Sequence, residues 1–245
     1  MSEPAVYVYG VVSGSSPAAK GTGVATAAPV RTVAGDGFAA VVSDVPADWR
    51  TGGRDDLQAH DRVLAALVAQ HAVVPMRFGV VMESDEAVRE RLLAGHAGEL
   101  GALFERLDDR VQMSVKAYYV GEALLREVVR RYPQLKRNPK SQPERIALGR
   151  DVAAAVEEQR ALDQDLLLAP LSEPADDVRV EPPAAERQAL NLQLLVARPR
   201  RAQLDATVTR LATEYGDRFA FRYVGPLAPY SFSTMSLDAG ERAWG

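Results

Sequence analysis

The sequence predicts an α+β protein of two domains that meet near Asp109. Segments rich in valine and aromatic residues are interspersed with amphipathic segments of helical period, without the regular alternation of a doubly wound fold. The Gly35-Asp36-Gly37 turn between two β-like segments is a strong hairpin signal. The 245 residues, of which 47% are apolar, are enough to bury a substantial core.

The first predicted domain covers residues 1–109. Its segment DDLQAHDRVLAALVAQHA shows the periodicity of an amphipathic helix, with an apolar stripe formed by Leu57, Leu64, Leu67 and Val68. Ser84 is placed to cap a second helical region, in which Gly95 and Gly98 are candidate breaks. The expected elements, in chain order, are strands at 5–12, 30–34 and 38–44, a helix at 55–72, a strand at 73–81 and a helical region at 84–109.

The second predicted domain covers residues 110–235 and is followed by a short polar tail at 236–245. The expected elements are a strand at 110–120, helices at 121–132 and 143–171, strands at 178–181 and 189–197, a helix at 198–216 and a strand at 218–225. This βαββαβ order with an enlarged first crossover is typical of a ferredoxin-like fold. The strand at 178 is the least regular element, because it lies in a proline-rich connection.

Arg77 stands in the otherwise apolar segment HAVVPMRFGVV, from His71 to Val81. A buried guanidinium is costly unless it is paired. We therefore expect Arg77 to be a structural clamp. Its side chain would point from the less buried face of a strand to a carboxylate or to the carbonyls of a neighbouring loop.

The sequence lacks the patterns of a catalytic, metal or cofactor site. There are no cysteines, which excludes thiolate chemistry and fits a reducing cytoplasm, and no nucleotide-binding or nucleophile-elbow motif is present. His60 and His71 are eleven residues apart, so on one helix they stand roughly 16 Å from each other and cannot share a metal ion. No segment has the length and apolarity of a signal peptide or a membrane span. The sequence predicts no enzyme, cofactor or small-molecule substrate.

Two further segments are candidates for contacts. The first is a basic run that would dock an acidic partner or a phosphate backbone, or would remain a solvated loop; it is formed by Arg130, Arg131, Lys136, Arg137 and Lys140. The second is the C-terminal motif GPLAPYSF, expected to form an ordered turn on the second domain through Gly225, Pro226, Pro229, Tyr230 and Phe232.

Three segments together resemble the gas vesicle protein F/L family: VYVYGVV, HAVVPMRFGVV and YVGPLAPYSF. The resemblance extends from Val6 to about Phe232, although Leu227 stands where members often have tryptophan and Val80 where threonine is common. It implies two α+β domains and a cytoplasmic accessory protein of buoyant gas vesicles. It also implies that the chain binds the apolar shell subunit during assembly or enters the vesicle as a minor component.

We expect contact with the shell subunit in the first domain, through apolar and backbone contacts at strand edges. The candidate residues are Tyr7, Tyr9, Met76 and Phe78. One alternative is a nucleic-acid-binding ferredoxin-like module, against which stand the pI near 5.5 and the lack of a basic and aromatic strand motif. Another is an enzyme that holds an anion with Arg77 or Arg31, against which stands the absence of a credible nucleophile or base.

Overall fold

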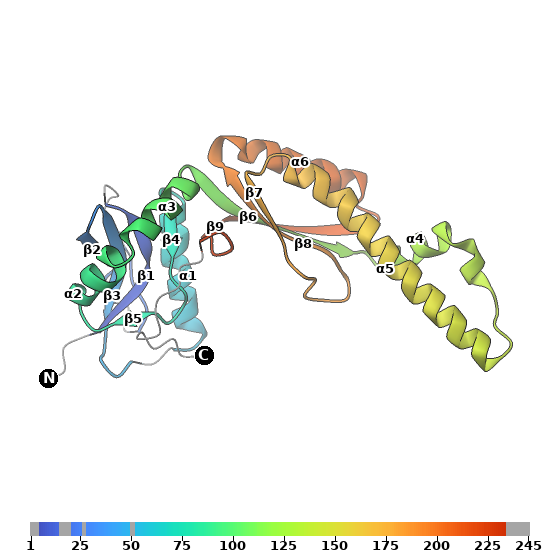
Figure 1. Cartoon of the computed structure of the whole chain (residues 1–245), viewed down its shortest axis with the longest axis horizontal. Helices are drawn as coiled ribbons and strands as arrows, with labels where there is room; N and C mark the ends of the chain where they lie inside the picture. Colours follow the sequence, from blue (N-terminus) through green and yellow to red (C-terminus); the bar gives the residue numbers. More distant parts are fainter. Residues whose placement is uncertain (1–4, 15–20, 26–27, 50–51, 234–245) are drawn as a thin grey trace. The chain divides into compact units, whose positions relative to one another are not determined.

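The computed structural model describes residues 5–14, 21–25, 28–49 and 52–233. The chain forms two compact units (Figure 1). Unit 1 contains the described residues up to Gln112 together with residues 226–233, and unit 2 is Met113–Gly225. The division expected from sequence differs mainly at the C-terminal end, where residues 226–233 belong to unit 1 instead of the second domain.

Unit 1 contains an antiparallel sheet in the order β2-β3-β1-β4, and β5 also pairs with β1. The strands are β1 Ala5–Ser13, β2 Arg31–Gly35, β3 Phe38–Val45, β4 Val73–Pro75 and β5 Val81–Met82. The hairpin between β2 and β3 turns at Asp36 and Gly37, whose φ angles are 52° and 81°. Two successive residues of positive φ match the twist of the strands, which is why this dipeptide forms the turn.

The helices of unit 1 lie on both faces of this sheet. They are α1 Arg54–Val68, α2 Asp85–Ala87, the π-helical η1 Val88–Ala94 and α3 Ala97–Leu107. Phe38 and Ser43 are five residues apart in the regular strand β3, so their side chains point to opposite faces. Phe38 stacks on Phe104 of α3, whereas Ser43 faces the side covered by α1. The central strand β1 is therefore buried on both faces.

The predicted helices of unit 1 are present with two differences. Leu64, Leu67 and Val68 are buried as the stripe predicts, but Leu57 is exposed near the beginning of α1. The region after Ser84 contains three helical pieces, and the Ser84 hydroxyl caps the first by accepting the N–H of Ala87 at 3.2 Å. Gly95 follows η1, at one of the two breaks expected from sequence.

Unit 2 is built on a four-stranded sheet in the order β7-β8-β6-β9. The strands are β6 Arg110–Tyr119, β7 Asp177–Val180, β8 Gln188–Ala197 and β9 Phe219–Leu227. At the end of β6, the Tyr119 N–H donates to the Arg187 carbonyl at 2.8 Å and the Val120 N–H donates to the Arg218 carbonyl at 2.9 Å. These residues precede β8 and β9, so β6 runs antiparallel to both. The α+β prediction is confirmed, and the strand expected at 178 is present.

The helices of unit 2 are α4 Ala123–Arg131, η2 Pro133–Lys136, α5 Gln142–Ser172, η3 Arg198–Arg200 and α6 Arg201–Glu214. The core between α5, α6 and the sheet contains Leu167, Leu194, Leu204 and Phe219, all buried. Figure 1 shows that α4 and the first half of α5 project beyond the end of this sheet. No helix in the described ranges has the length and apolarity needed to cross a membrane.

Candidate functional site

His60 is a buried histidine that joins two tyrosines in unit 1. It comes from the sheet-facing side of α1, four and seven residues before Leu64 and Leu67, and only 1% of it is exposed. Its Nδ1 lies 2.8 Å from the Tyr7 hydroxyl of β1, and its Nε2 lies 2.8 Å from the Tyr230 hydroxyl near the C-terminus. Its place on the apolar stripe was the sequence signal that it would be buried.

The partners of the two hydroxyls determine where the protons lie. The Gly79 N–H donates to the Tyr7 oxygen at 3.1 Å, and the Tyr230 hydroxyl donates to the Met76 carbonyl at 3.1 Å. The Tyr7 hydroxyl then donates to Nδ1, and Nε2–H donates to the Tyr230 oxygen. In this tautomer, with the imidazole proton on Nε2, every donor and acceptor from Tyr7 to the Met76 carbonyl has a partner. In the other tautomer, with the proton on Nδ1, the Tyr7 hydroxyl proton has no acceptor among the described residues.

Burial keeps this chain of hydrogen bonds uncharged. It lowers the pKa of His60 to about 4, because an imidazolium at this position would lose its hydration. Burial likewise raises the pKa of the Tyr7 and Tyr230 hydroxyls above the usual tyrosine value. The imidazole is therefore neutral near pH 7 and acts as a structural link. Within the described ranges, no three or more potential ligand side chains are grouped to hold a metal ion.

A second buried hydroxyl is organised around an irregularity in β1. Val8 pairs with Val42 and Gly10 pairs with Val41, so Tyr9 is the extra residue of a β-bulge. Its hydroxyl lies 2.9 Å from the Ser43 Oγ and accepts the Val24 N–H at 2.8 Å. The Tyr9 ring lies 4.9 Å from that of Tyr7, centroid to centroid, and stacks on the His60 ring at 5.6 Å.

The C-terminal motif is part of this arrangement. Phe232 is buried, and Ser231 exchanges two hydrogen bonds with the Gln112 side chain, at 3.1 and 3.3 Å. The Ser233 hydroxyl donates to the Pro229 carbonyl at 2.7 Å. This segment is expected from sequence to dock on the second predicted domain, residues 110–235, and Ser231 does contact Gln112 near the start of β6. Tyr230, however, binds His60 and the Met76 carbonyl of unit 1.

The residues expected to contact the shell subunit are largely in the core. Tyr7, Tyr9 and Met76 are buried between the sheet and the elements packed on it, and Phe78 is only partly exposed. The apolar pattern that suggested a contact surface is thus the pattern of a strand buried on both faces. The first three side chains do not present a surface in this structure, which corrects their assignment.

The environment of Arg77 also corrects an expectation. The segment expected to be one strand leaves the sheet after Pro75 and rejoins it at Val81, and both ends pair with β1. Residues 76–80 form an excursion that turns at Gly79, where φ is 96°, and presents the Met76 carbonyl to Tyr230. Arg77 is exposed on this excursion and forms no hydrogen bond or ion pair with any residue that the structure describes.

Arg31 forms the clamp that sequence analysis assigned to Arg77. Its guanidinium binds both carboxylate oxygens of Asp85 at 2.8 Å and the Asp44 carboxylate at 2.5 Å. It thereby joins β2 to the adjacent strand and to the first turn of α2. The hydrogen bonds to Asp85 are the main cause that raises the pKa of Arg31. The sequence signal was the acidic residue in the first turn after the Ser84 cap.

Unit 2 contains a buried ion pair that sequence analysis missed. Asp163 of α5 is buried and pairs with Arg218, the residue directly before β9. The Gln159 side chain donates to the same carboxylate at 2.8 Å. The Arg218 guanidinium lies 5.1 Å from the centroid of the Phe219 ring, so its other side is covered by an aromatic face. The spacing of Gln159 and Asp163 by one helical turn was the available signal.

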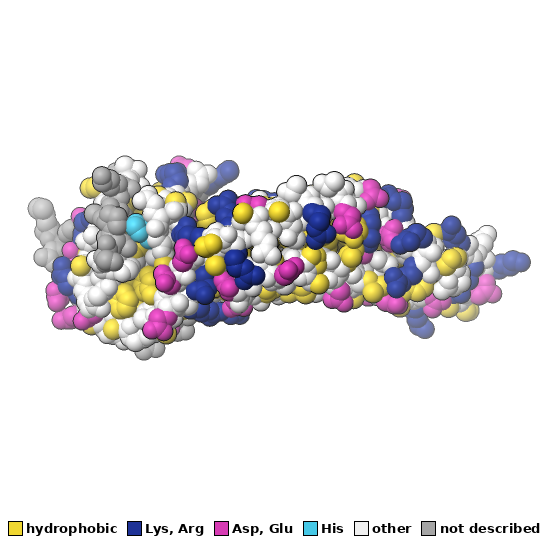
Figure 2. All heavy atoms as spheres, turned by 90° about the horizontal axis from the view of Figure 1, so that it is seen from above, with side chains coloured by type: hydrophobic (Ala, Val, Ile, Leu, Met, Phe, Trp, Pro, Cys, Tyr) yellow, Lys and Arg dark blue, Asp and Glu magenta, His cyan; other side chains and the backbone are white. Residues whose placement is uncertain are grey.

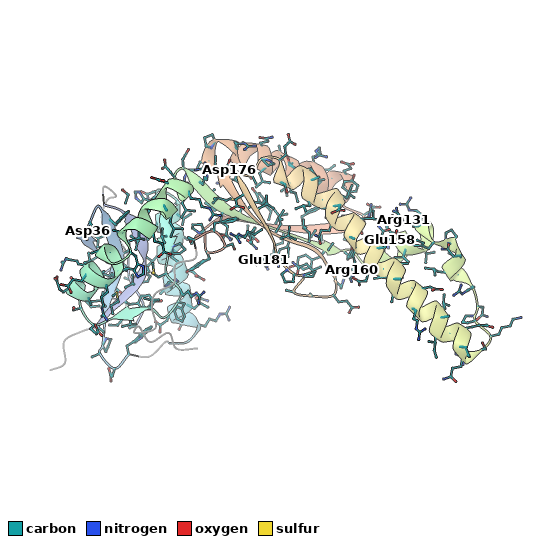
Figure 3. All side chains as sticks on the ribbon, in the orientation of Figure 1. Asp36, Arg131, Glu158, Arg160, Asp176 and Glu181 are labelled. Carbon is teal, nitrogen blue, oxygen red and sulfur yellow. The ribbon has the colours of Figure 1, made fainter. Side chains whose placement is uncertain are left out.

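The basic run lies at the junction of α4, η2 and α5. Arg130 pairs with Glu127 at 2.5 Å and Arg137 pairs with Asp151 at 2.6 Å, so part of its charge is neutralised locally. Arg131 closes α4, which packs against α5 (Figure 3). The side chains of Lys136 and Lys140 form no ion pair within the described part of the chain.

Comparison with known proteins identifies the class of molecule. The family described as "Gas vesicle synthesis protein GvpL/GvpF" matches residues 5–234. Gas vesicle protein F of Streptomyces sp. (strain CB03234) is 36% identical over 92% of this chain and 98% of that protein, and gas vesicle protein L of the same strain is 32% identical over 78% and 72%. The crystal structure of GvpF from Anabaena sp. PCC7120 has the same fold, with a TM-score of 0.82, 24% identity, and coverage of 96% of this chain and 98% of that one.

These similarities and the α+β fold define a gas vesicle protein. The chain belongs to the GvpL/GvpF family. The resemblance carried by VYVYGVV, HAVVPMRFGVV and YVGPLAPYSF is thereby confirmed. Residues from all three segments, Tyr7, Met76 and Tyr230, belong to the hydrogen-bonded chain around His60.

Proposed function

We propose that this protein binds the apolar shell subunit of the gas vesicle, in the cytoplasm during assembly or as a minor component of the finished vesicle. The observation that carries the proposal is membership of the GvpL/GvpF family over residues 5–234. The physical reason is general: a small subunit with a large apolar surface aggregates unless a partner covers it before assembly. The proposed role is binding, without catalysis, a cofactor or a membrane.

Open strand edges in unit 2 support this proposal. In the described part of the chain, β7 and β9 each pair with one strand only, so each leaves one edge free. Val180 on β7 is 45% exposed and Val224 on β9 is 39% exposed, which gives each edge strand an apolar side chain at the surface. An unpaired edge accepts a further strand through backbone hydrogen bonds, and neighbouring apolar side chains add affinity. The proposed contact is therefore at these edges, since Tyr7, Tyr9 and Met76 are buried.

We also propose that unit 2 is a ferredoxin-like domain with an enlarged first crossover. Its elements follow the order β6, α4, α5, β7, β8, α6, β9, which corresponds to βαββαβ with one additional helix. The first and third strands lie in the centre of the sheet and the second and fourth at its edges. This arrangement leaves the two edges free, which is why the fold bears on binding.

Two experiments test the proposed function. The first deletes the gene in a vesicle-forming host, with the wild-type gene returned on a plasmid as control; loss of buoyant vesicles that the plasmid restores is the expected result. The second captures purified shell subunit on the immobilised protein at low and high salt. Apolar and backbone contacts should survive moderate salt, in contrast to phosphate contacts.

A variant with Val180→Lys and Val224→Lys locates the contact. Lysine on an edge strand discourages pairing with a further strand, so capture of the shell subunit should fall. Leu57→Lys, at an exposed apolar position on α1, is the matched control and should capture normally. Normal vesicles after deletion, together with no capture at either salt level, would refute the proposal.

A further inference from the structure

The hairpin formed by α4, η2 and the start of α5 is a separate surface of unit 2. We call residues 123–154 the α4–α5 arm. None of the first thirteen residues of α5 is buried, and the first buried residue of this helix is Ala155. At about 1.5 Å per residue, this is roughly 20 Å of helix without a buried residue, and α5 packs against α4 and η2. So long an exposed extension contributes little to the core of unit 2.

The arm is held in one conformation by local contacts. The Ser141 hydroxyl accepts the Glu144 N–H, and the Glu144 carboxylate accepts the N–H groups of Ser141 and Lys140, at 3.4 and 2.7 Å. This capping box fixes the start of α5. The ion pair between Arg137 and Asp151, at 2.6 Å, ties the connecting segment to the helix. A surface ordered in advance loses less entropy when it binds.

The arm carries an excess of positive charge in a chain that is acidic overall. It contains eight basic and three acidic residues, whereas the net charge of the whole chain is −4. All three acidic side chains are engaged within the arm: Glu127 and Asp151 by arginines, and Glu144 by the helix cap. Several Lys and Arg side chains cover this part of the surface in Figure 2. Among the eight cations, Arg130 and Arg137 alone form ion pairs with described residues, and Arg126 donates to the Asp217 carbonyl. The side chains of Lys136, Lys140, Arg145 and Arg150 have neither an ion pair nor a hydrogen bond within the described part of the chain.

The same arm exposes two large aliphatic side chains. Leu125 of α4 is 49% exposed and Ile146 of α5 is 50% exposed. A phosphate backbone gains nothing from aliphatic side chains, and single-stranded nucleic acids without defined sequence are bound by stacking of bases on aromatic rings. Tyr132 is the one aromatic residue of the arm, and it is only partly exposed. A polypeptide that carries both carboxylates and apolar side chains matches both features of the arm.

We propose that the α4–α5 arm is a preformed docking site for an acidic, amphipathic segment of another protein. Carboxylates of the partner would approach Lys136, Lys140, Arg145 and Arg150, and its apolar side chains would cover Leu125 and Ile146. This contact goes beyond the proposed function, because it uses charge and a helical surface, whereas shell-subunit binding is placed at strand edges. With both the arm and the strand edges as binding surfaces, the protein would join the shell subunit to a second, acidic protein.

Binding of a defined probe tests this inference. The probe is a fluorescent 20-residue helical peptide of leucine and glutamate, with leucines four residues apart, and its anisotropy is followed at low and moderate salt. The wild-type protein should bind the peptide, and added salt should weaken binding. A triple variant with Lys136→Glu, Arg145→Glu and Arg150→Glu should bind about tenfold more weakly or worse. The matched control, with Arg54→Glu, Arg62→Glu and Arg222→Glu, has the same net charge and should bind as the wild type does.

A second variant separates the apolar part of the contact. Ile146→Ser leaves every charge in place, so it should weaken binding of the peptide without changing the salt dependence. A triple variant with Lys136→Gln, Arg145→Gln and Arg150→Gln is the control for a folding defect in the glutamate variant. Thermal unfolding of both variants would reveal such a defect. Four results would overturn the proposal. Three concern binding: no peptide binding by the wild type, equal loss in the arm and control variants, or tighter arm-dependent binding of single-stranded RNA than of the peptide. The fourth is arm-dependent self-association in sedimentation, because the occupant would then be a second copy of the chain.

Discussion

The Nε2 atom of His60 and the hydroxyl of Tyr230 lie 2.8 Å apart although 170 residues separate them in the chain. Through this contact the C-terminal segment is bonded to α1, and through Nδ1 the same imidazole is bonded to β1. Tyr230 also donates to the Met76 carbonyl, which fixes the excursion between β4 and β5. One neutral side chain, together with Tyr230, thus connects four segments of unit 1.

The first prediction concerns Tyr230→Phe. The substitution keeps the ring and removes the hydroxyl that accepts from His60 and donates to Met76, so two buried polar groups lose their partner. We expect the free energy of unfolding to fall by about 1–3 kcal/mol, as measured by urea denaturation. Tyr118→Phe is the control, because no hydrogen bond of the Tyr118 hydroxyl is present in the described structure, and it should be nearly neutral. Equal effects would show that the His60–Tyr230 bond contributes nothing specific.

The second prediction is a dependence of stability on pH that comes from His60. Its pKa is about 4 in the folded protein and about 6.5 in the unfolded chain, so the unfolded state binds the proton first. The contribution of His60 to the free energy of unfolding is complete above pH 6.5. It is lost as the pH falls towards 4, and the total loss is about 3 kcal/mol.

Urea denaturation at several pH values between 7 and 4 measures this loss. His60→Gln should flatten the curve between pH 6.5 and 4.5, where few carboxylates titrate. If the stability of His60→Gln changed with pH as steeply as that of the wild type, His60 would not be a neutral buried imidazole.

The parts of the fold set by local sequence could be predicted, and those set by distant contacts could not. Asp36 and Gly37 turn the hairpin because of their own backbone preferences, and the apolar period of Leu64 and Leu67 buries α1 wherever the sheet lies. By contrast, the docking of Tyr230 depends on an acceptor and a donor far away in the sequence, and no local pattern specifies them. The gain or loss of one residue in a strand, as in the bulge at Tyr9, is equally invisible in a pattern of alternating apolar residues.

The third prediction concerns the buried carboxylate of unit 2. Asp163→Asn removes the charge that faces Arg218 and leaves the guanidinium without its counterion. We expect a loss of about 3 kcal/mol in the free energy of unfolding, since breaking a buried pair on one side leaves an uncompensated charge. Asp165→Asn, two residues along the same helix at an exposed position, should change stability little. A loss no larger than that of Asp165→Asn would mean that Arg218 is solvated well enough to need no partner.

The last prediction separates the clamp that exists from the one that the sequence suggested. Arg31 binds Asp44 and Asp85 in unit 1, but about a third of its side chain is exposed, so each ion pair is partly screened by water. Arg31→Gln should lower the free energy of unfolding by about 1 kcal/mol, and the loss should shrink in high salt. Arg77→Gln removes an equal charge from an exposed turn and should leave stability unchanged at either salt concentration. Combining Arg31→Gln with Asp85→Asn in a double-mutant cycle then isolates the bidentate contact from the general loss of charge. A coupling energy of zero between Arg31 and Asp85 would contradict the clamp at Arg31. A larger loss of stability from Arg77→Gln than from Arg31→Gln would show that Arg77 is the clamp, contrary to the structure around both arginines.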